Sequence, residues 1–319
     1  MMQVREGSTA AKPALAVLCS VFNEEATIPL FYDRVAAVFA QIQDRYEPSL
    51  YFIDNGCIDG SLRLIIELNE RSPNIFAIVL SRNFGYQCAL ATGLQEVEAD
   101  LYVMIDVDCE DPPELILDFL RHHEEGNDIV YGERLDRPEN AVIKGMRFLF
   151  YRLVRSVADD NFVLDMAEFS LITAEVRGAI IQDSTSFPFL RASIGRIGFR
   201  RRPVPYKRSA RVAGVTHYNF LGMVMFAVAG TLSASTLALR IPAYVFPFWA
   251  LAMTGVAVSA VVTPAHWQMP LLLALGFVFV GFTTTAIGIY CARIYKDGLR
   301  RPNAIVRRKL SLLPPRRGA

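Results

Sequence analysis

Residues 101–113 read LYVMIDVDCEDPP, an apolar run that ends in four acidic side chains within six residues. Asp106 and Asp108 alternate at the end of the run, and Glu110 and Asp111 follow before a proline pair. Like charges this close together are unfavourable unless a cation neutralises them. Carboxylate oxygens suit Mg²⁺ or Mn²⁺, and magnesium is commonly held by one or two carboxylates together with substrate phosphates. The stretch therefore predicts a metal–diphosphate site at the end of a strand.

A structural role is open for part of this cluster. Pro112 and Pro113 suit the first turn of a helix, and an acid near a helix N-terminus is stabilised by the helix dipole. Stabilisation of a helix start would explain the presence of Asp111 and, at most, that of Glu110. It does not account for the alternating pair before them, so the metal site remains the better hypothesis for that pair.

Similar apolar runs recur upstream and alternate with helical patterns. The runs are 15–21, 50–54, 76–80 and 101–106, and the helical patterns are 24–45, 61–69, 87–96 and 114–124. This alternation predicts an α/β domain with a mainly parallel sheet, in which ligands bind beyond the carboxyl ends of the strands. No G-x-G-x-x-G follows a strand and no P-loop pattern occurs, which disfavours dinucleotide dehydrogenases and P-loop nucleotidases.

The composition argues against several functional classes. The 33 Lys and Arg residues are balanced by 32 Asp and Glu residues, and the net charge of +1 argues against a nucleic-acid partner. The five cysteines form no C-x-x-C pair, so neither a structural zinc site nor a disulfide framework is expected. The first fifteen residues lack the apolar segment of a secretory signal. The domain is therefore expected to face the cytosol.

The C-terminal third has the composition of a membrane segment. Arg240 is the only charged side chain in residues 212–292. Two stretches, 242–262 and 270–292, are long enough to cross a hydrocarbon core of about 30 Å, and they predict a transmembrane hairpin. The preceding stretch 220–239 is less hydrophobic, because it contains several Gly, Ser and Thr residues. It is interpreted as an interfacial helix, with a third span as the alternative.

Charge placement orients the hairpin. Nine Lys and Arg residues follow the second span in the basic tail 293–319, whereas the turn between the spans has none. The positive-inside rule then places the tail and the catalytic domain, 1–211, on the cytoplasmic face of the inner membrane, with 212–241 as a juxtamembrane region. The tail is also expected to rest on anionic lipid headgroups. A hairpin that buries little of itself would allow a homo-oligomer.

Residues 191–211, directly before the membrane segment, carry eight Lys and Arg side chains and no acid. One interpretation is a belt that binds anionic lipid headgroups. The other is a clamp for a phosphate carried by a lipid, because guanidinium groups bind phosphate in a bidentate manner. Both stay open for the run as a whole, and the clamp is favoured for Arg208 and Arg211.

Four stretches together resemble the successive motifs of a known family. They are 20–25 (SVFNEE), 53–61 (IDNGCIDGS), 81–85 (SRNFG) and 105–113 (IDVDCEDPP). In this order they are similar to the motifs of inverting GT-A glycosyltransferases of family two. The resemblance, which covers about 14–308, is strongest to polyprenyl-phosphate glycosyltransferases, namely dolichol-phosphate mannose synthases and bactoprenyl-phosphate glucosyltransferases. Residues 288–302 look like the end of the hairpin in the bacterial branch.

The resemblance implies roles for individual residues. It implies that the nucleotide-sugar is bound by Ser20, Phe22, Glu24, Asp54 and Asp106. It implies that Mg²⁺ or Mn²⁺ is held by Asp106, Asp108 and Glu110. It implies that the phosphate of the lipid acceptor meets Arg134, Arg208 and Arg211. The catalytic residues that it implies are Asp108, Asp165 and Arg208.

Several positions depart from the family pattern. Asn55 and Cys57 stand where an acid and a serine are usual, and Ser170 stands where an arginine is usual. Thr216 and His217 replace a common Ser-Lys pair. Glu168 either acts on the sugar or is a solvated charge at the edge of the sheet.

The expected reaction is the inverting transfer of one sugar from a nucleotide-sugar, expected to be UDP-linked, to a polyprenyl phosphate. A processive membrane glycan synthase is an alternative, although the chain lacks its usual Gln-x-x-Arg-Trp helix and further spans. A membrane-anchored nucleotide-sugar-binding protein with weakened catalysis is the other alternative, prompted by the departures from the family pattern.

Overall fold

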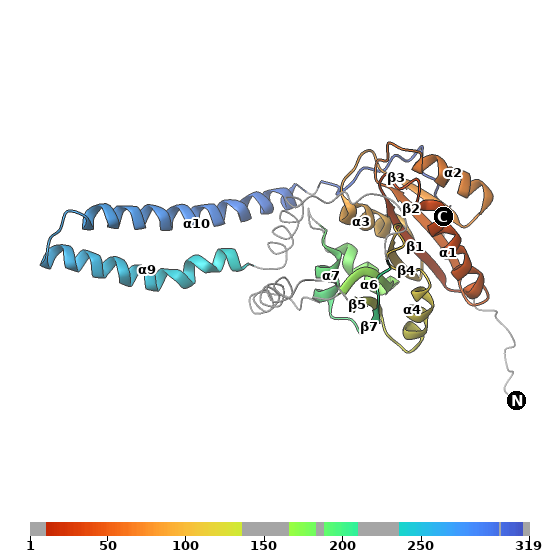
Figure 1. Cartoon of the computed structure of the whole chain (residues 1–319), viewed down its shortest axis with the longest axis horizontal. Helices are drawn as coiled ribbons and strands as arrows, with labels where there is room; N and C mark the ends of the chain where they lie inside the picture. The colour runs from red at the N-terminus through yellow and green to blue at the C-terminus, as the bar shows by residue number, and fades with distance from the viewer. Residues whose placement is uncertain (1–10, 136–165, 183–187, 210–235, 300, 315–319) are drawn as a thin grey trace, which may run out of the picture.

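The computed structural model describes residues 11–135, 166–182, 188–209, 236–299 and 301–314. In that part of the chain an α/β domain is followed by two long helices (Figure 1). The strands are β1 (Ala14–Val21), β2 (Glu47–Asp54), β3 (Ile75–Val79), β4 (Leu101–Asp106), β5 (Ile129–Arg134), β6 (Met166–Thr173) and β7 (Arg201–Tyr206). The helices of the domain are α1 (Ile28–Ile42), α2 (Ser61–Arg71), α3 (Tyr86–Glu96), α4 (Leu115–Glu124), α6 (Ala174–Gln182) and α7 (Leu190–Ile197).

These strands form one sheet in the order β3-β2-β1-β4-β6-β5-β7. Among the described strands only β6 runs antiparallel to its neighbours, β4 and β5. The sheet is therefore mainly parallel, as the sequence predicts, and the four apolar runs are β1 to β4. The basic run 191–211 includes β7 and all of α7 except its first residue, and neither element had a counterpart among the predicted ones.

Both faces of the sheet are covered by helices. Alternate residues of β1 point to opposite faces, so that Leu15 and Val17 pack with α1, α2 and α4, whereas Ala16 and Leu18 pack with α3, α6 and α7. Strands buried on both faces need apolar side chains at every position, which explains the continuous runs that β1 and β4 show in the sequence. Because β1 to β4 are parallel, their carboxyl ends lie at one edge of the sheet, where polar residues follow each strand.

Helices α9 (Leu237–Val262) and α10 (Gln268–Gly298) lie side by side and project from the domain (Figure 1). Both are long and apolar enough to cross a membrane. Many of their apolar side chains are exposed, among them Phe248 and Phe277 at 76% and 77%. Trp249 stacks on Phe279 with ring centroids 4.6 Å apart and joins the two helices. The stretch 220–239, interpreted as interfacial, lies almost entirely outside the described residues.

After α10 the chain returns to the domain as a C-terminal strap, residues 301–314. The strap runs along the open edge of β3. Ala77 exchanges two backbone hydrogen bonds with Leu312, at 2.9 and 2.8 Å, and the Ser81 N–H donates to the Ile305 carbonyl at 2.9 Å. Pairing of this kind protects an otherwise open edge. The backbone of these residues therefore lies against the domain, and the contact of the tail with lipid headgroups stays a prediction.

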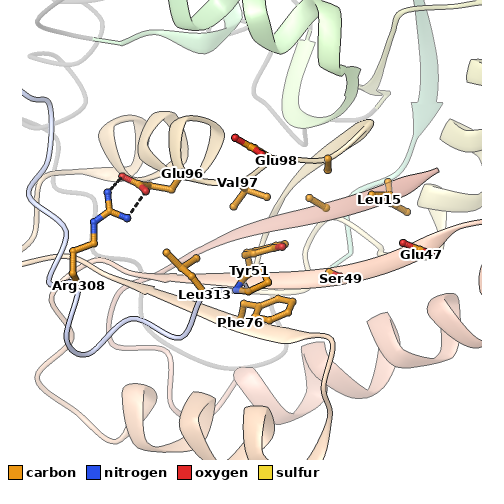
Figure 2. Close-up of a pocket in the computed structure, with 14 residues that line it drawn as sticks. Leu15, Glu47, Ser49, Tyr51, Phe76, Glu96, Val97, Glu98, Arg308 and Leu313 are labelled. Carbon is orange, nitrogen blue, oxygen red and sulfur yellow. Dashed lines mark hydrogen bonds and ion pairs between the residues drawn. The ribbon is translucent and has the colours of Figure 1, made fainter. Parts of the chain in front are cut away.

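The strap also contacts the far end of α3. Arg308 makes a bidentate ion pair with Glu96, with both N–O distances 2.6 Å (Figure 2). Leu313 lies beside the stacked rings of Tyr51 and Phe76, whose centroids are 4.9 Å apart. The strap thus closes one side of a cavity of ≈350 Å³ at the amino ends of the strands, opposite the edge where ligands are expected.

Deletion of residues 301–319 is expected to destabilise the domain by about 2 kcal/mol, because β3 loses several backbone hydrogen bonds worth about 1 kcal/mol each before the entropy of the freed segment is counted. The melting temperature of the detergent-solubilised protein should fall by about 4–8 °C. Arg308→Gln alone should cost below about 1 kcal/mol, because Arg308 is 57% exposed. An unchanged melting temperature after the deletion would show that the edge pairing contributes no stability.

Candidate active site

A pocket of ≈630 Å³ opens at the carboxyl edge of the sheet, within the size range of sites for small ligands. Its walls come from the loops after β1 to β4, from the ends of β5 and α3, and from β6, α7 and the segment after β7. The lining residues are Ser20, Phe22, Glu24, Asn55, Asn83, Gly85, Tyr86, Gln87, Asp106, Val107, Asp108, Arg134, Glu168, Arg191 and Arg208.

The loop after β1 is fixed by hydrogen bonds to the loop after β2. Asn23 has a φ of 57°, in the left-handed region that asparagine tolerates, and its side-chain oxygen accepts a hydrogen bond from the Ile58 N–H at 2.9 Å. The Glu24 N–H donates to the Ser61 hydroxyl at 3.0 Å. The Thr27 hydroxyl donates to a Glu24 carboxylate oxygen, also at 3.0 Å. These bonds hold the Glu24 side chain in the pocket wall.

The two departures in the loop after β2 have structural roles. Asn55 is buried, and its side-chain oxygen accepts a hydrogen bond from the Phe84 N–H at 2.9 Å, which an aspartate could accept equally. Cys57 accepts a hydrogen bond from the Asn23 N–H at 3.3 Å. The Asp54 carboxylate accepts one from the Cys57 N–H at 2.8 Å and turns into this loop, so it does not line the pocket.

Asp106 and Asp108 both line the pocket beyond the end of β4. The Asp108 carboxylate accepts a hydrogen bond from the Glu110 N–H at 3.0 Å, which fixes the turn. Burial, and then the charge of Asp108, raise the pKa of Asp106 to about 7. Two crowded carboxylates fit the oxygen donors that Mg²⁺ and Mn²⁺ prefer. Within the described residues no three His, Cys, Asp or Glu side chains converge as a ligand set.

Asp111 joins three elements behind the pocket. It is fully buried, and it accepts hydrogen bonds from the Tyr206 hydroxyl at 2.5 Å and from Arg134 Nη2 at 3.0 Å. Arg208 Nε lies 3.4 Å from the same carboxylate, and Arg208 Nη1 pairs with Glu110 at 2.5 Å. Burial, and then the Asp111 charge, raise the pKa of Tyr206. The acid therefore positions two arginines that line the pocket.

The helix-start role expected for Asp111 is wrong. Helix α4 begins at Leu115 with Glu114 as its N-cap, and the Asp111 side chain bonds to residues of β5 and β7 instead. The Asp111 carboxylate therefore bonds to side chains distant in the sequence, Arg134 and Tyr206, and not to the start of the helix that follows it.

A second polar group lies in the same pocket on β6, α3 and α7. Glu168 accepts a hydrogen bond from Gln87 Nε2 at 2.9 Å and forms an ion pair with Arg191 Nε at 2.7 Å. The other end of the Gln87 amide accepts a buried hydrogen bond from the Leu190 N–H at 3.1 Å. Burial, and then the charges of Asp106 and Glu168, raise the pKa of the nearby Tyr86 hydroxyl. Because β6 lies inside the sheet, Glu168 is not a charge at its edge.

The structure gathers seven of the predicted site residues in one pocket: Ser20, Phe22, Glu24, Asp106, Asp108, Arg134 and Arg208. Asp54 and Glu110 lie beside the pocket without lining it, and Asp165 and Arg211 lie outside the described residues. The roles given to these residues stay predictions. Tyr86 and Gln87 were not predicted, and Arg191 was predicted only as a member of the basic run 191–211. The first two directly follow the 81–85 motif, so the strand-end rule that selected Asp106 could have found them.

The raised pKa of Asp106 predicts pH-dependent metal binding. A carboxylate must lose its proton to bind a cation, so Mn²⁺ affinity is expected to rise about tenfold per pH unit up to about pH 7 and to level off above it. Titrations with Mn²⁺ alone between pH 5.5 and 8.5 would measure this.

The stability of the metal-free protein should depend on pH in the opposite direction. Asp106 binds its proton more tightly in the folded state than in the unfolded chain, so the free energy of unfolding should decline as the pH rises from about 4 to about 7. Asp106→Asn should remove both trends, and a pH-independent affinity would contradict the prediction.

Comparison with known proteins adds a family match. The model of the family described as glycosyl transferase family 2 matches residues 16–177, just over half of the 319 residues. The bactoprenol glucosyl transferase of Shigella phage SfV is 29% identical over 303 residues, which cover 92% of this chain and 98% of that protein. An uncharacterized glycosyltransferase of Bacillus subtilis (strain 168) is 29% identical over 310 residues, 93% of this chain and 94% of its own.

Solved structures also resemble the chain. The Pyrobaculum calidifontis mannosyltransferase, solved with GDP-Man and Mn²⁺, aligns with a TM-score of 0.43 at 15% identity, covering 91% of this chain and 87% of that one.

Proposed function

The chain belongs to glycosyl transferase family 2, and we propose that it transfers a single sugar from a nucleotide-sugar to a polyprenyl phosphate, with inversion at the anomeric carbon. Membership makes it a glycosyltransferase with an α/β fold of GT-A type. The observation that carries the proposal is one pocket lined by Asp106 and Asp108 together with Arg134 and Arg208, on a domain joined to two apolar helices. The full-length likeness to a bactoprenol glucosyl transferase supports the choice of acceptor.

The donor would bind along the ends of β1 and β4. Ser20, Phe22 and Glu24 line the side of the pocket where base and ribose would lie, and Asp106 and Asp108 would hold Mg²⁺ or Mn²⁺. When bound, the ion supplies positive charge that stabilises the departing nucleoside diphosphate. A UDP-linked donor follows from the resemblance of the hairpin to the bacterial branch of the family.

The acceptor would be held by arginines. Arg134 and Arg208 line the pocket while bound to Asp111 behind it, so their guanidinium groups are already oriented for a phosphate. Arg211, outside the described residues, would extend this clamp. An oxygen of the lipid phosphate would attack the anomeric carbon as the bond to the nucleoside diphosphate breaks, and the diphosphate would leave with the electron pair.

This reaction requires little base catalysis. The second pKa of a phosphate monoester lies near 6, so the acceptor oxygen is already anionic at neutral pH. Among the described residues no histidine lines the pocket. The protein's contribution would be to bring two anions together and to screen their repulsion with arginines, which is a matter of positioning and fixed charge.

The membrane provides the second substrate. The start of α9 and the end of α10 lie at the same end of the hairpin, on the side of the domain (Figure 1), so an even number of spans would leave the domain and the strap on one side. The basic residues that follow α10 favour the cytoplasmic side. The pocket would then work at the surface from which the lipid phosphate is presented.

The full-length protein in detergent or proteoliposomes tests the proposal directly. With Mn²⁺, undecaprenyl phosphate and a panel of radiolabelled nucleotide-sugars, we expect one sugar per lipid and an equal amount of nucleoside diphosphate. A ladder of sugars would instead identify a processive synthase. Nucleotide-sugar that binds without being consumed would identify a binding protein, and either result would overturn the proposal.

A further inference from the structure

The pocket contains an acidic group that the proposed reaction leaves unused. The Glu168 side chain is 13% exposed and lies in the wall that β6 contributes, beside Tyr86. It is held from two sides, by the amide of Gln87 on α3 and by the guanidinium of Arg191 on α7. A carboxylate fixed by two side chains from two helices has little freedom to move, which is the property that a recognition group needs.

The bonding of this group is incomplete. The Gln87 amide is used at both ends, by Glu168 and by the Leu190 N–H. Arg191 Nε is buried, and the acceptor that the structure places beside it among the described residues is a Glu168 oxygen at 2.7 Å. Both Glu168 and Arg191 line the pocket. Gln87 Nε2 and Arg191 Nε both contact the same Glu168 oxygen, so the Glu168 carboxylate keeps acceptor capacity toward the pocket, in a pair whose net charge is zero.

We propose that Glu168, held by Gln87 and Arg191, receives hydroxyl groups of the donor sugar and selects a neutral sugar for transfer. This inference rests on the proposed function and adds the sugar class to it. A carboxylate accepts hydrogen bonds from hydroxyls and a guanidinium donates to them, so the pair matches a polyol. A site built in this way rejects substrates that leave its buried polar groups unpaired. A uronate would find no uncompensated positive charge here, because Arg191 is already paired with Glu168, so the cost of removing its carboxylate from water would not be repaid.

The charge argument gives opposite predictions for the two partners. Glu168→Gln leaves Arg191 without its counter-charge, so the preference for UDP-glucose over UDP-glucuronate, measured as the ratio of kcat/KM values, should fall by about tenfold or more. Arg191→Gln leaves Glu168 uncompensated, so the same ratio should rise. Affinity for UDP alone should stay within about threefold in both variants, because the pair would contact the sugar and not the nucleotide.

A matched control lies at the other end of α3. Glu96→Gln breaks an ion pair of the same kind, with Arg308, but Glu96 does not line the pocket. The sugar ratio should be unchanged in that variant. If Glu168→Gln and Arg191→Gln lower the affinities for UDP and UDP-glucose equally, or move the ratio in the same direction, the residues form a structural latch and the proposal is overturned.

Binding measurements separate this inference from the proposed function. Affinities for UDP, UDP-glucose and UDP-glucuronate, measured with Mn²⁺ and no lipid, test sugar selection by Glu168. Product analysis with undecaprenyl phosphate tests the acceptor. Selective binding without a lipid-linked product would refute the proposed reaction alone, and a lipid-linked product whose sugar selection ignores Glu168 would refute this inference alone.

Discussion

Asp108→Asn is expected to lower turnover by about three orders of magnitude while the protein stays folded. The substitution keeps the shape of the side chain, and an amide oxygen can still accept the hydrogen bond from the Glu110 N–H that fixes the turn. What it removes is one of two carboxylates that would hold the divalent cation, and charge stabilisation by a metal is worth several kcal/mol in the transition state. Transfer of radiolabelled sugar to undecaprenyl phosphate would measure the loss.

The same variant should reveal the cause of the loss. The charge of Asp108 helps to raise the pKa of Asp106, so its removal should move that pKa back toward the ordinary value for an aspartate. Repulsion within the metal-free site would decrease, and the melting temperature without metal should be unchanged or slightly higher. The increase in melting temperature caused by Mn²⁺ should disappear.

A surface aspartate provides the control for this substitution. Asp118 pairs with Arg121 on α4 and is 45% exposed, so Asp118→Asn should leave both turnover and the Mn²⁺ effect unchanged. Full activity of Asp108→Asn, or a large drop in its stability, would contradict the assignment of Asp108 to the metal site.

The site residues that follow β1 and β4 could be predicted because the sequence pattern that marks each strand lies next to them in the chain. Strands β1 and β4 are buried on both faces, which forces the apolar runs that mark them in the sequence. Parallel strands bring their carboxyl ends to one edge, so the polar residues after each run had to meet. Glu24 and Asp106, 82 positions apart in the chain, therefore share a pocket as expected.

The remaining features depend on contacts between distant parts of the chain, which no local sequence pattern predicts. Strand β7 has exposed arginines at its start and two prolines, so it reads as a basic linker in the sequence. Glu168 could not be distinguished from an edge charge until β6 was found between β4 and β5. The strap pairs with β3 through backbone groups, which any sequence offers, so nothing in its side chains predicted the pairing.

Asp111 is the clearest case of such a contact, and its removal is expected to have the second large effect. Asp111→Asn should destabilise the protein by about 3 kcal/mol and lower its melting temperature by about 10 °C, because it leaves Arg134, only 21% exposed, beside a neutral amide. Arg134 and Arg208 would lose their shared anchor, so the KM for undecaprenyl phosphate should rise as well. Thermal unfolding and initial rates over a range of lipid concentrations would measure the two effects. Tyr206→Phe is the matched control. It deletes the hydrogen bond to Asp111 and the one that the hydroxyl accepts from Arg134 Nε at 3.1 Å, but it keeps the ion pairs. It should therefore cost about 1–2 kcal/mol and change that KM much less than Asp111→Asn does. Equal effects of the two variants would show that the charge of Asp111 does not organise the arginines.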